Sequence, residues 1–355
     1  MQSFVYQSLP SRIVFAVGGL SRIGEEMDRL GARRALVLAT PEQRADARRV
    51  AEILGERHAG VFAEAAMHVP IETARAAVAE AKRLNADCAV TIGGGSTTGL
   101  GKAIALESSI PILAVPTTYA GSEVTPIYGL TEGGLKKTGR DPRVLPRTVI
   151  YDPQLTVSMP KQLTATSGMN AMAHAVEGLY AADANPITSL MAEEGIRALA
   201  VGLPRAVARP DDIEARADCL YGAWLCGTVL GAVGMALHHK LCHTLGGSFN
   251  LPHAETHTVV LPHAAAYNFS VAREAMARTQ RALGAKDAAS GLFDLAAGLG
   301  APMTLDQIGM RASDLDRAAD LAVAAPYPNP RPIERGAIRK LLDDAFYGRR
   351  PGPLS

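Results

Sequence analysis

The chain lacks the features that mark a secreted, membrane-bound or nucleic-acid-binding protein. Its 355 residues carry a formal net charge of +1 and no long basic run, so nothing predicts binding to nucleic acid or to a membrane surface. No apolar stretch reaches the length of a membrane span, and the first residues have neither the basic region nor the apolar core of a signal peptide. We therefore expect a soluble, cytoplasmic protein.

Cysteine is scarce, and no two cysteines form a CxxC pair. The four residues lie scattered through apolar segments, at Cys88, Cys219, Cys226 and Cys242. This pattern predicts reduced, buried thiols. The remaining composition, with 48% apolar and 20% charged residues, is ordinary for a soluble protein, and the length predicts two domains.

The first half of the chain alternates short apolar runs with segments of helical spacing. The runs of strand length are 34–40, 60–62, 88–92, 110–115 and 148–151. The helical segments between them are 42–54, 71–84 and 97–106. This alternation predicts a parallel sheet with helices on both faces, in which ligands bind at the carboxyl ends of the strands.

Two small, hydroxyl-rich loops follow the third and fourth predicted strands. The first begins Gly93-Gly94-Gly95-Ser96-Thr97, and the second begins Pro116-Thr117-Thr118. Neither loop has the G-x-G-x-x-G fingerprint or the Walker spacing, and either one alone is typical of a simple turn. Two such loops at adjacent strand ends favour a dinucleotide, because glycine lets a ligand approach the backbone and a helix N-terminus binds phosphate. The candidate cofactor-binding residues are Gly94, Gly95, Ser96, Thr97, Thr117 and Thr118.

The end of the first predicted strand lacks an acidic residue. Ala39-Thr40 stands where a carboxylate usually binds the ribose 2′-hydroxyl of NAD. Without that charge the 2′-phosphate of NADPH meets less repulsion. Both NADH and NADPH are therefore plausible cofactors.

The second half of the chain is predicted to be helical. Segments of helical length and composition are 166–182, 187–200, 211–230, 232–245, 273–283, 288–299, 312–324 and 333–346. A proline-rich connector at 326–332 precedes the last of them, and no repeat of solenoid period is evident. We expect a boundary near 153–160, which separates an α/β domain at 1–157 from an all-helical domain at 158–355.

Histidines gather in the segment 237–263, which holds six of the nine in the chain. His239 and His243 are four residues apart and would share one face of a helix. Gly246 and Gly247 are expected to end that helix, and Pro252 to place the next histidine, His253, in a loop. Grouped imidazoles suit metal ligation or proton transfer, whereas unrelated surface and core histidines are the alternative.

A second polar pair, Asn170 and His174, has the same spacing of four on another predicted helix. A helix with one polar stripe is the alternative for this pair alone. Taken in order, the Gly-Gly-Gly-Ser loop, the Pro-Thr-Thr loop, this pair and the three histidines resemble the iron-containing (group III) alcohol dehydrogenase family along nearly the whole chain. The resemblance implies a dehydroquinate synthase-like fold, with a Rossmann-like dinucleotide-binding domain, an all-α domain and an active site in the cleft between them.

The resemblance also assigns positions to a metal site. In metal-dependent members an Asp and three His hold the ion, and the matching positions here are Asn170, His174, His239 and His253. His243 matches a histidine used in proton handling. An Asn amide is neutral and a weaker ligand than a carboxylate, although three imidazoles can still bind zinc.

Two departures from the metal-dependent pattern, Asn170 and Gly99, resemble the maleylacetate reductase branch of the family. So do the stretches 93–106, 116–127 and 329–333. This resemblance implies NADH- or NADPH-dependent reduction of 2-maleylacetate to 3-oxoadipate in bacterial breakdown of aromatic compounds, by a homodimer without a tightly bound metal. The main alternative is a metal-dependent dehydrogenase of a small alcohol or aldehyde. A lyase on this fold would keep the carboxylate that Asn170 replaces, and a non-enzymatic cofactor-binding protein would leave the histidines without a purpose.

The dicarboxylate substrate sets the expected roles of the candidate residues. We expect His243 and His253 to polarise the ketone and donate the proton, with His174 and His239 shaping the pocket. Two further residues, Asn170 and Arg331, are candidates for binding the substrate. The family match places Lys137 near the cofactor.

Overall fold

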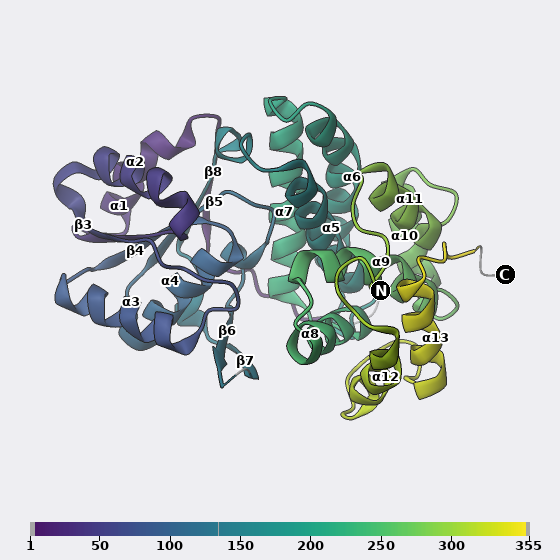
Figure 1. Cartoon of the computed structure of the whole chain (residues 1–355). Helices are drawn as coiled ribbons and strands as arrows, with labels where there is room; N and C mark the ends of the chain where they lie inside the picture. The colour runs from purple at the N-terminus through teal and green to yellow at the C-terminus, as the bar shows by residue number, and fades with distance from the viewer. Residues whose placement is uncertain (1–3, 134, 353–355) are drawn as a thin grey trace. The chain divides into compact units, whose positions relative to one another are not determined.

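The computed structural model describes residues 4–133 and 135–352, and the chain divides into two compact units. One unit is Ser8–Met159, and the other contains the chain from Pro160 onward together with the residues before Ser8. The first unit is of the α/β type and the second is helical (Figure 1). This is the predicted fold class.

A six-stranded sheet forms the middle of the α/β unit, and all its strand pairs are parallel. In spatial order the strands are β1 (Arg12–Phe15), β8 (Thr148–Tyr151), β5 (Ile112–Pro116), β4 (Cys88–Gly93), β2 (Ala35–Leu38) and β3 (His58–Phe62). Five of them match predicted strands, whereas the short edge strand β1 was missed. From β2 the chain goes to β3 on one side and then to β4 on the other, so a topological switch point lies between β2 and β4, where such sheets bind ligands.

Helices cover both faces of this sheet because side chains of a buried strand alternate between its faces. In β2, Ala35 and Val37 face α1 (Ile23–Arg29) and α2 (Arg44–Leu54). Leu36 and Leu38 face α3 (Ile71–Arg83) and α4 (Gly95–Ser108). The strands are therefore apolar on both sides, as a parallel sheet covered by helices requires.

A second, two-stranded antiparallel sheet was not predicted from the sequence. It consists of β6 (Ile127–Glu132) and β7 (Leu135–Arg140). All residues of β6 are at least partly exposed, so the strand has no buried face to impose an apolar alternation. Because β6 lacks a buried face, its sequence shows no apolar alternation from which a strand could be predicted.

The helical unit contains nine α-helices among the residues that the structure describes. They are α5 (Lys161–Gly178), α6 (Pro186–Ala208), α7 (Ile213–Ala232), α8 (Leu237–Phe249), α9 (His253–Asn268), α10 (Arg273–Leu283), α11 (Ala288–Gly298), α12 (Leu315–Val323) and α13 (Arg335–Phe346). Eight of them correspond to predicted helical segments.

Helix α9 is the exception. Two expectations were wrong here, one about the start of α9 and one about the end of α8. His253 is not in a loop but is the first residue of α9, directly after Pro252 at the N-cap. The preceding helix α8 also runs past Gly246 and Gly247 to Phe249, and it ends at Asn250 in the left-handed conformation with φ 54°. The glycines were expected to stop α8, but glycine only weakens a helix interior, by about 1 kcal/mol.

Helix α5 lies in the interior of the helical unit, and every residue from Thr164 to Gly178 is buried. It packs against α6, α7 and α9. Its glycines permit this close packing: a Cβ at Gly168 would lie 2.3 Å from Cδ2 of Leu203, and one at Gly178 would lie 2.2 Å from Cγ1 of Val229. The polar residues of α5 are therefore held inside the protein.

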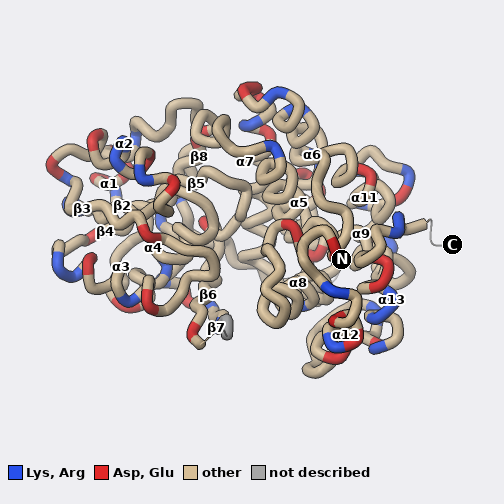
Figure 2. Tube along the Cα trace, viewed as in Figure 1, with Lys and Arg blue, Asp and Glu red and all other residues tan. Residues whose placement is uncertain are grey.

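Positive and negative residues are interspersed over both units (Figure 2). None of the four cysteines, all of them described and buried, forms a disulfide, as predicted. Within the described residues, no single helix has the length and hydropathy of a membrane span, and α7 with α8 meets that test only as a pair bent by 94°.

Candidate active site

Six histidines from three helices form one cluster in the helical unit. Helix α5 contributes His174, the start of α8 contributes His238, His239 and His243, and the start of α9 contributes His253 and His257. The ring centroids of His253 and His257 are 4.3 Å apart, those of His239 and His257 are 4.9 Å apart, and those of His174 and His239 are 5.2 Å apart. The structure thus brings together all four histidines that the sequence singled out, and adds His238 and His257.

The cluster has a buried part and an accessible part. The side chains of His174, His239 and His257 are buried, whereas His253 is half-buried and His243 is exposed. Burial, together with the nearby His243, lowers the pKa of His239 to about 3. Burial and the neighbouring imidazoles likewise hold the pKa values of His174 and His257 well below their usual range. The buried imidazoles are therefore neutral at physiological pH.

A buried carboxylate, Glu177 of α5, anchors the start of α8. Its Oε1 accepts a hydrogen bond from the backbone N–H of His238 at 2.6 Å. Its Oε2 accepts hydrogen bonds from the backbone N–H of His239 at 3.2 Å and from Nδ1 of the same residue at 2.6 Å. Burial raises the pKa of Glu177, and His238 and the backbone donors oppose that shift. Sequence reasoning missed Glu177, although its spacing of three from His174 puts both on one face of α5.

Several buried polar atoms in the cluster have no hydrogen-bond partner within the protein. They are Oδ1 of Asn170, Nδ1 of His174, Nε2 of His239 and both ring nitrogens of His257. Buried polar atoms in proteins are almost always hydrogen-bonded. Such a concentration of unpartnered atoms is therefore typical of a site that receives a polar group.

In metal-dependent members of the resembled family four positions hold a divalent ion, and the donor atoms at the matching positions here determine whether an ion fits. Asn170, His174, His239 and His253 offer neutral donors, of which the two buried imidazoles are deprotonated and able to ligate. Three imidazoles suffice for a catalytic zinc site, so these residues fit a divalent ion, but they supply no negative charge. Glu177 does not replace the missing carboxylate, because His239 and the start of α8 occupy both of its oxygens.

A different trio has the closest ring nitrogens. One nitrogen from each of His238, His239 and His257 lies within 4.8 Å of the others. However, Nε2 of His238 donates a hydrogen bond to the carbonyl oxygen of His257 at 3.0 Å, and its Nδ1 lies 3.4 Å from Nδ1 of His239. The one N–H of neutral His238 is therefore engaged by a backbone carbonyl and its Nδ1 faces that of His239, which makes it a structural residue of the cluster.

In the α/β unit, the two predicted cofactor loops lie side by side at the carboxyl ends of β4 and β5. The backbone N–H of Thr117 donates a hydrogen bond to the carbonyl oxygen of Gly93 at 3.0 Å. Nε2 of Gln43, just after β2, donates one to Oγ1 of Thr117 at 2.8 Å. Loops from three adjacent strands thus meet next to the switch point of the sheet.

The glycines of the first cofactor loop let its backbone lie close to neighbouring side chains. Gly93 has φ 152°, and a Cβ there would lie 2.4 Å from Oγ1 of Thr97. A Cβ at Gly94 would lie 2.9 Å from Oγ1 of Thr118. Helix α4 begins at Gly95, so the N–H groups of its first turn are available to a phosphate. Oγ1 of Thr97 is buried there without a partner, which adds a polar atom to this predicted anion site.

The two remaining candidates lie outside these constellations. Lys137 is exposed on β7 and forms an ion pair with Glu132 of the same hairpin at 3.0 Å. Arg331 lies over the ring of Tyr267 at 4.3 Å and donates a hydrogen bond from Nη1 to the backbone carbonyl of that residue at 3.2 Å. Their predicted roles, in cofactor and substrate binding respectively, stay predictions.

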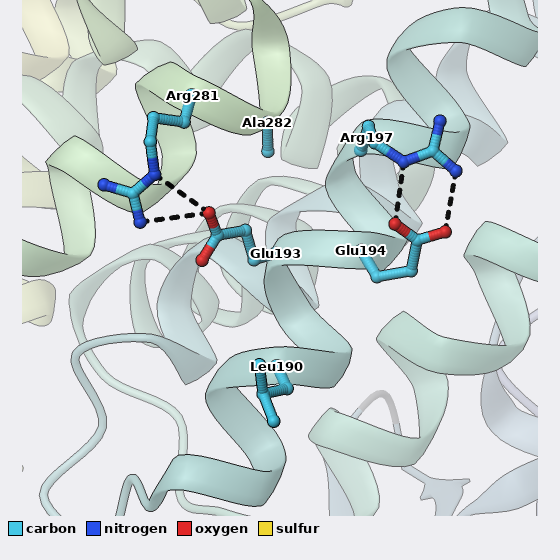
Figure 3. A pocket seen from close by; sticks show the side chains of 6 residues that line it. All are labelled: Leu190, Glu193, Glu194, Arg197, Arg281 and Ala282. Atoms are coloured by element: carbon cyan, nitrogen blue, oxygen red, sulfur yellow. Dashed lines mark hydrogen bonds and ion pairs between the residues drawn. The ribbon is translucent and has the colours of Figure 1, made fainter.

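A surface hollow elsewhere in the helical unit is lined by charged residues of α6 and α10 that already have partners. Glu193 pairs with Arg281 at 3.0 Å, and Glu194 pairs with Arg197 at 2.7 Å (Figure 3). Since these charges are satisfied on the protein surface, the hollow offers little to a ligand.

Comparison with known proteins covers nearly the whole chain. Residues 10–153 match the family model described as iron-containing alcohol dehydrogenase, and residues 164–346 match the model described as Fe-containing alcohol dehydrogenase family, C-terminal. The chain is 63% identical to a maleylacetate reductase from Burkholderia cepacia over 99% of its own length and 100% of that protein. It is 58% identical to one from Sphingobium indicum over 98% and 99% of the two chains. The crystal structure of maleylacetate reductase from Agrobacterium tumefaciens superposes with a TM-score of 0.96 at 57% identity, covering 99% of this chain and 100% of that one.

Proposed function

The chain belongs to the iron-containing alcohol dehydrogenase family, and from this premise we propose that it is a maleylacetate reductase. It uses NADH or NADPH to reduce the carbon–carbon double bond of 2-maleylacetate, and the product is 3-oxoadipate. The full-length similarity to maleylacetate reductases carries this proposal. The cluster of neutral imidazoles around Asn170, where the metal-dependent pattern has a carboxylate, supports it from the geometry.

The chemistry requires a hydride, a hydrogen-bond donor and a proton. The double bond of maleylacetate is conjugated to a ketone. Hydride from C4 of the nicotinamide adds to the carbon beta to that ketone, the double-bond electrons move toward the ketone oxygen, and an enolate and the oxidised cofactor result. A proton then adds to the alpha carbon and restores the ketone. The protein must therefore stabilise negative charge on the oxygen and deliver one proton to carbon.

His243 and His253 supply these two functions in our proposal. They are the more accessible members of the cluster, whereas His174, His239 and His257 are buried. Access to water lets an imidazole recover its proton after each turnover. The buried histidines shape the site and carry no charge, whereas the carboxylate of Glu177 is negative. A protonated histidine at its accessible edge would then attract a dianionic substrate, and Arg331 would bind one of its carboxylates.

We propose further that the reduction does not depend on a bound metal. Asn170, His174, His239 and His253 would hold a divalent ion if one bound, and the ion would supply Lewis-acid stabilisation to the ketone oxygen. With no anionic ligand among them, their affinity for the ion is reduced, and imidazole N–H donors provide the same stabilisation. Metal analysis of the purified protein, with turnover measured before and after chelation, tests this point. Activity that disappears on chelation and returns with Fe²⁺ or Zn²⁺ would overturn it.

The remaining features follow from the same proposal. The enzyme would act in the cytoplasm, as a homodimer, in the breakdown of aromatic compounds, with a small dicarboxylate as its substrate and without nucleic acid or membrane partners. Light scattering of the purified protein tests the dimer. The Gly94–Thr97 and Thr117–Thr118 loops would bind the pyrophosphate and nicotinamide portions of the cofactor.

Consumption of NADH and NADPH with maleylacetate, set against a panel of simple alcohols and aldehydes, tests the activity directly. We expect turnover with maleylacetate and negligible turnover with the panel. Rapid oxidation of a small alcohol by NAD⁺, with no reduction of maleylacetate, would favour the metal-dependent dehydrogenase in its place.

A further inference from the structure

Glu177 accepts a hydrogen bond from Nδ1 of His239. We propose that this contact makes Glu177 a positioning residue for the active site. The carboxylate fixes His239 in the Nδ1–H tautomer, so that Nε2 presents a lone pair to the cluster. Nε2 then accepts a hydrogen bond from a neighbouring group or ligand and donates none, since the one ring N–H of His239 is directed at Glu177. This inference rests on the proposed reductase activity, which it deepens.

The hydrogen bonds of Glu177 determine which tautomer His239 adopts. An ionised carboxylate can only accept hydrogen bonds, and Oε2 of Glu177 lies 2.6 Å from Nδ1 of His239. The same carboxylate already accepts two backbone N–H groups of α8, which favours its ionised form. The proton of the short contact therefore resides on Nδ1. In a neutral imidazole the other nitrogen, Nε2, must then be an acceptor.

Three hydrogen bonds from the start of α8 to Glu177 of α5 hold this arrangement. Helix α8 has no side-chain cap of its own, and its N-cap residue is Ala236. Glu177 takes the place of the cap from another helix, and its negative charge at the positive end of α8 is favourable. Glu177 is fully buried and the side chain of His239 is only 7% exposed, so water does not compete for the hydrogen bond. Tyr180 adds a weaker contact, with its hydroxyl 3.5 Å from Oε1.

This tautomer determines which histidines can donate a hydrogen bond to the substrate. Nε2 of His239 is buried and has no partner within the protein. As an acceptor it can receive a hydrogen bond from a ligand, and the nearest rings are those of His238, His257 and His174, at 5.1, 4.9 and 5.2 Å between centroids. His239 therefore cannot donate to the ketone oxygen. That role falls to a histidine at the accessible edge of the cluster.

The test compares Glu177→Leu with Glu177→Gln in the full-length enzyme. Leucine removes both acceptor oxygens and releases His239. Glutamine keeps one oxygen, which can still face the two N–H groups of His239, while its NH2 group replaces the acceptor of the His238 N–H. We expect kcat with maleylacetate to fall about 10- to 100-fold in E177L, the size usual for loss of a group that orients a catalytic imidazole, with KM for NADH unchanged. E177Q should recover most of kcat. The matched control is Glu193→Leu, which removes a surface carboxylate of the same unit.

Nitrogen-15 NMR of histidine-labelled protein supplies a readout that needs no substrate. The His239 signals, assigned by comparison with His239→Gln, should show a protonated Nδ1 and a bare Nε2 in the wild-type enzyme and in E177Q. This measurement on the wild-type enzyme decides the proposal even if E177L does not fold. A wild-type His239 protonated on Nε2 would overturn it, as would a folded E177L with unchanged kcat or an E177Q as impaired as E177L. If the enzyme fails to reduce maleylacetate, the proposed function falls, but the tautomer can still be measured.

Discussion

Lys102 of α4 donates a hydrogen bond from Nζ to the backbone carbonyl of Ile127 at 2.6 Å, inside the α/β unit. The same nitrogen lies 2.7 Å from the carbonyl oxygen of Ser122 and 2.8 Å from that of Thr125, and the lysine is fully buried. Helix α4 follows the glycine loop, and residues 122–127 follow the second cofactor loop. Lys102 therefore connects the segments that carry both loops.

Replacement of Lys102 by Met should destabilise the enzyme and weaken cofactor binding. It removes the lysine donor from three carbonyl oxygens, of which that of Ser122 keeps the N–H and hydroxyl of Thr125 as donors, so we expect the free energy of unfolding to fall by about 3 kcal/mol. KM for NADH should rise more than KM for maleylacetate. Urea denaturation and steady-state kinetics measure the two effects. The control is Lys82→Met on the exposed side of α3, and equal stability of the two variants would contradict the prediction.

Replacement of Gly94 by Ala should impair cofactor binding without unfolding the protein. The new Cβ would lie 2.9 Å from Oγ1 and 3.1 Å from Cγ2 of Thr118, so that side chain must move. Overpacking of this kind costs about 1–3 kcal/mol of stability. A displaced Thr118 should also weaken cofactor binding by about 1.4 kcal/mol, which corresponds to a rise of about tenfold in KM for NADH. A Cβ at Gly336 meets nothing within 4 Å, so Gly336→Ala is the control. An unchanged KM in G94A would show that Thr118 does not contact the cofactor.

Single replacement of His243 or His253 by Ala should each lower kcat with maleylacetate by about 10²- to 10⁴-fold, the usual contribution of a general acid or base. KM for NADH should change little, because neither residue lies in the α/β unit. Stopped-flow hydride transfer, followed by NADH absorbance, measures the effect. His58→Ala on β3 is the control. Near-normal turnover in either variant would remove that histidine from the mechanism.

The buried histidines should make the enzyme sensitive to acid. Burial lowers the pKa of His238 and of His263 to about 4 in the folded protein, against about 6.5 in the unfolded chain. Between these values the unfolded chain binds protons that the folded protein excludes. The free energy of unfolding is therefore highest above pH 6.5 and falls as the pH falls toward 4, by about 1.4 kcal/mol per pH unit for each such histidine.

Urea titrations at pH 7.5, 6.5 and 5.5 measure this slope. The variant His263→Gln lies outside the active-site cluster and should reduce the slope by the share of one histidine. Equal stability at the three pH values would mean that these imidazoles have the same pKa in the folded protein as in the unfolded chain.

Replacement of Asn170 by Asp should restore the missing negative charge and increase the affinity for divalent metal. Oδ1 of Asn170 is buried without a partner, so a carboxylate in its place would face the same imidazoles. We expect N170D to retain zinc through dialysis where the parent protein does not, and to turn over maleylacetate more slowly because the substrate is itself anionic. Elemental analysis measures the first effect, with Asn250→Asp as the control. No gain in bound zinc would show that position 170 is not directed at the ion.

The amino-acid sequence by itself determined the parts of this protein that depend on neighbours along the chain. Alternating apolar runs and helical segments predicted the parallel sheet and eight of the nine helices that the structure describes in the second unit. The spacing of four predicted that Asn170 and His174 share one helix face and that His239 and His243 share another. Helical and extended periods are local properties, so local sequence is enough to reveal them.

Only the tertiary structure determined which residues these helix faces contact. Helix α9 was missed because Pro252 and Pro262 resemble breaks, yet the first stands at its N-cap and the second lies within it. Glu177 and His239 are 62 residues apart and meet only because the fold brings α5 and the start of α8 within hydrogen-bond distance. Local spacing carries no information on which helices become neighbours or which buried atoms are left without a partner. The histidine-rich segment was therefore visible in the sequence, whereas the carboxylate that orients it was not.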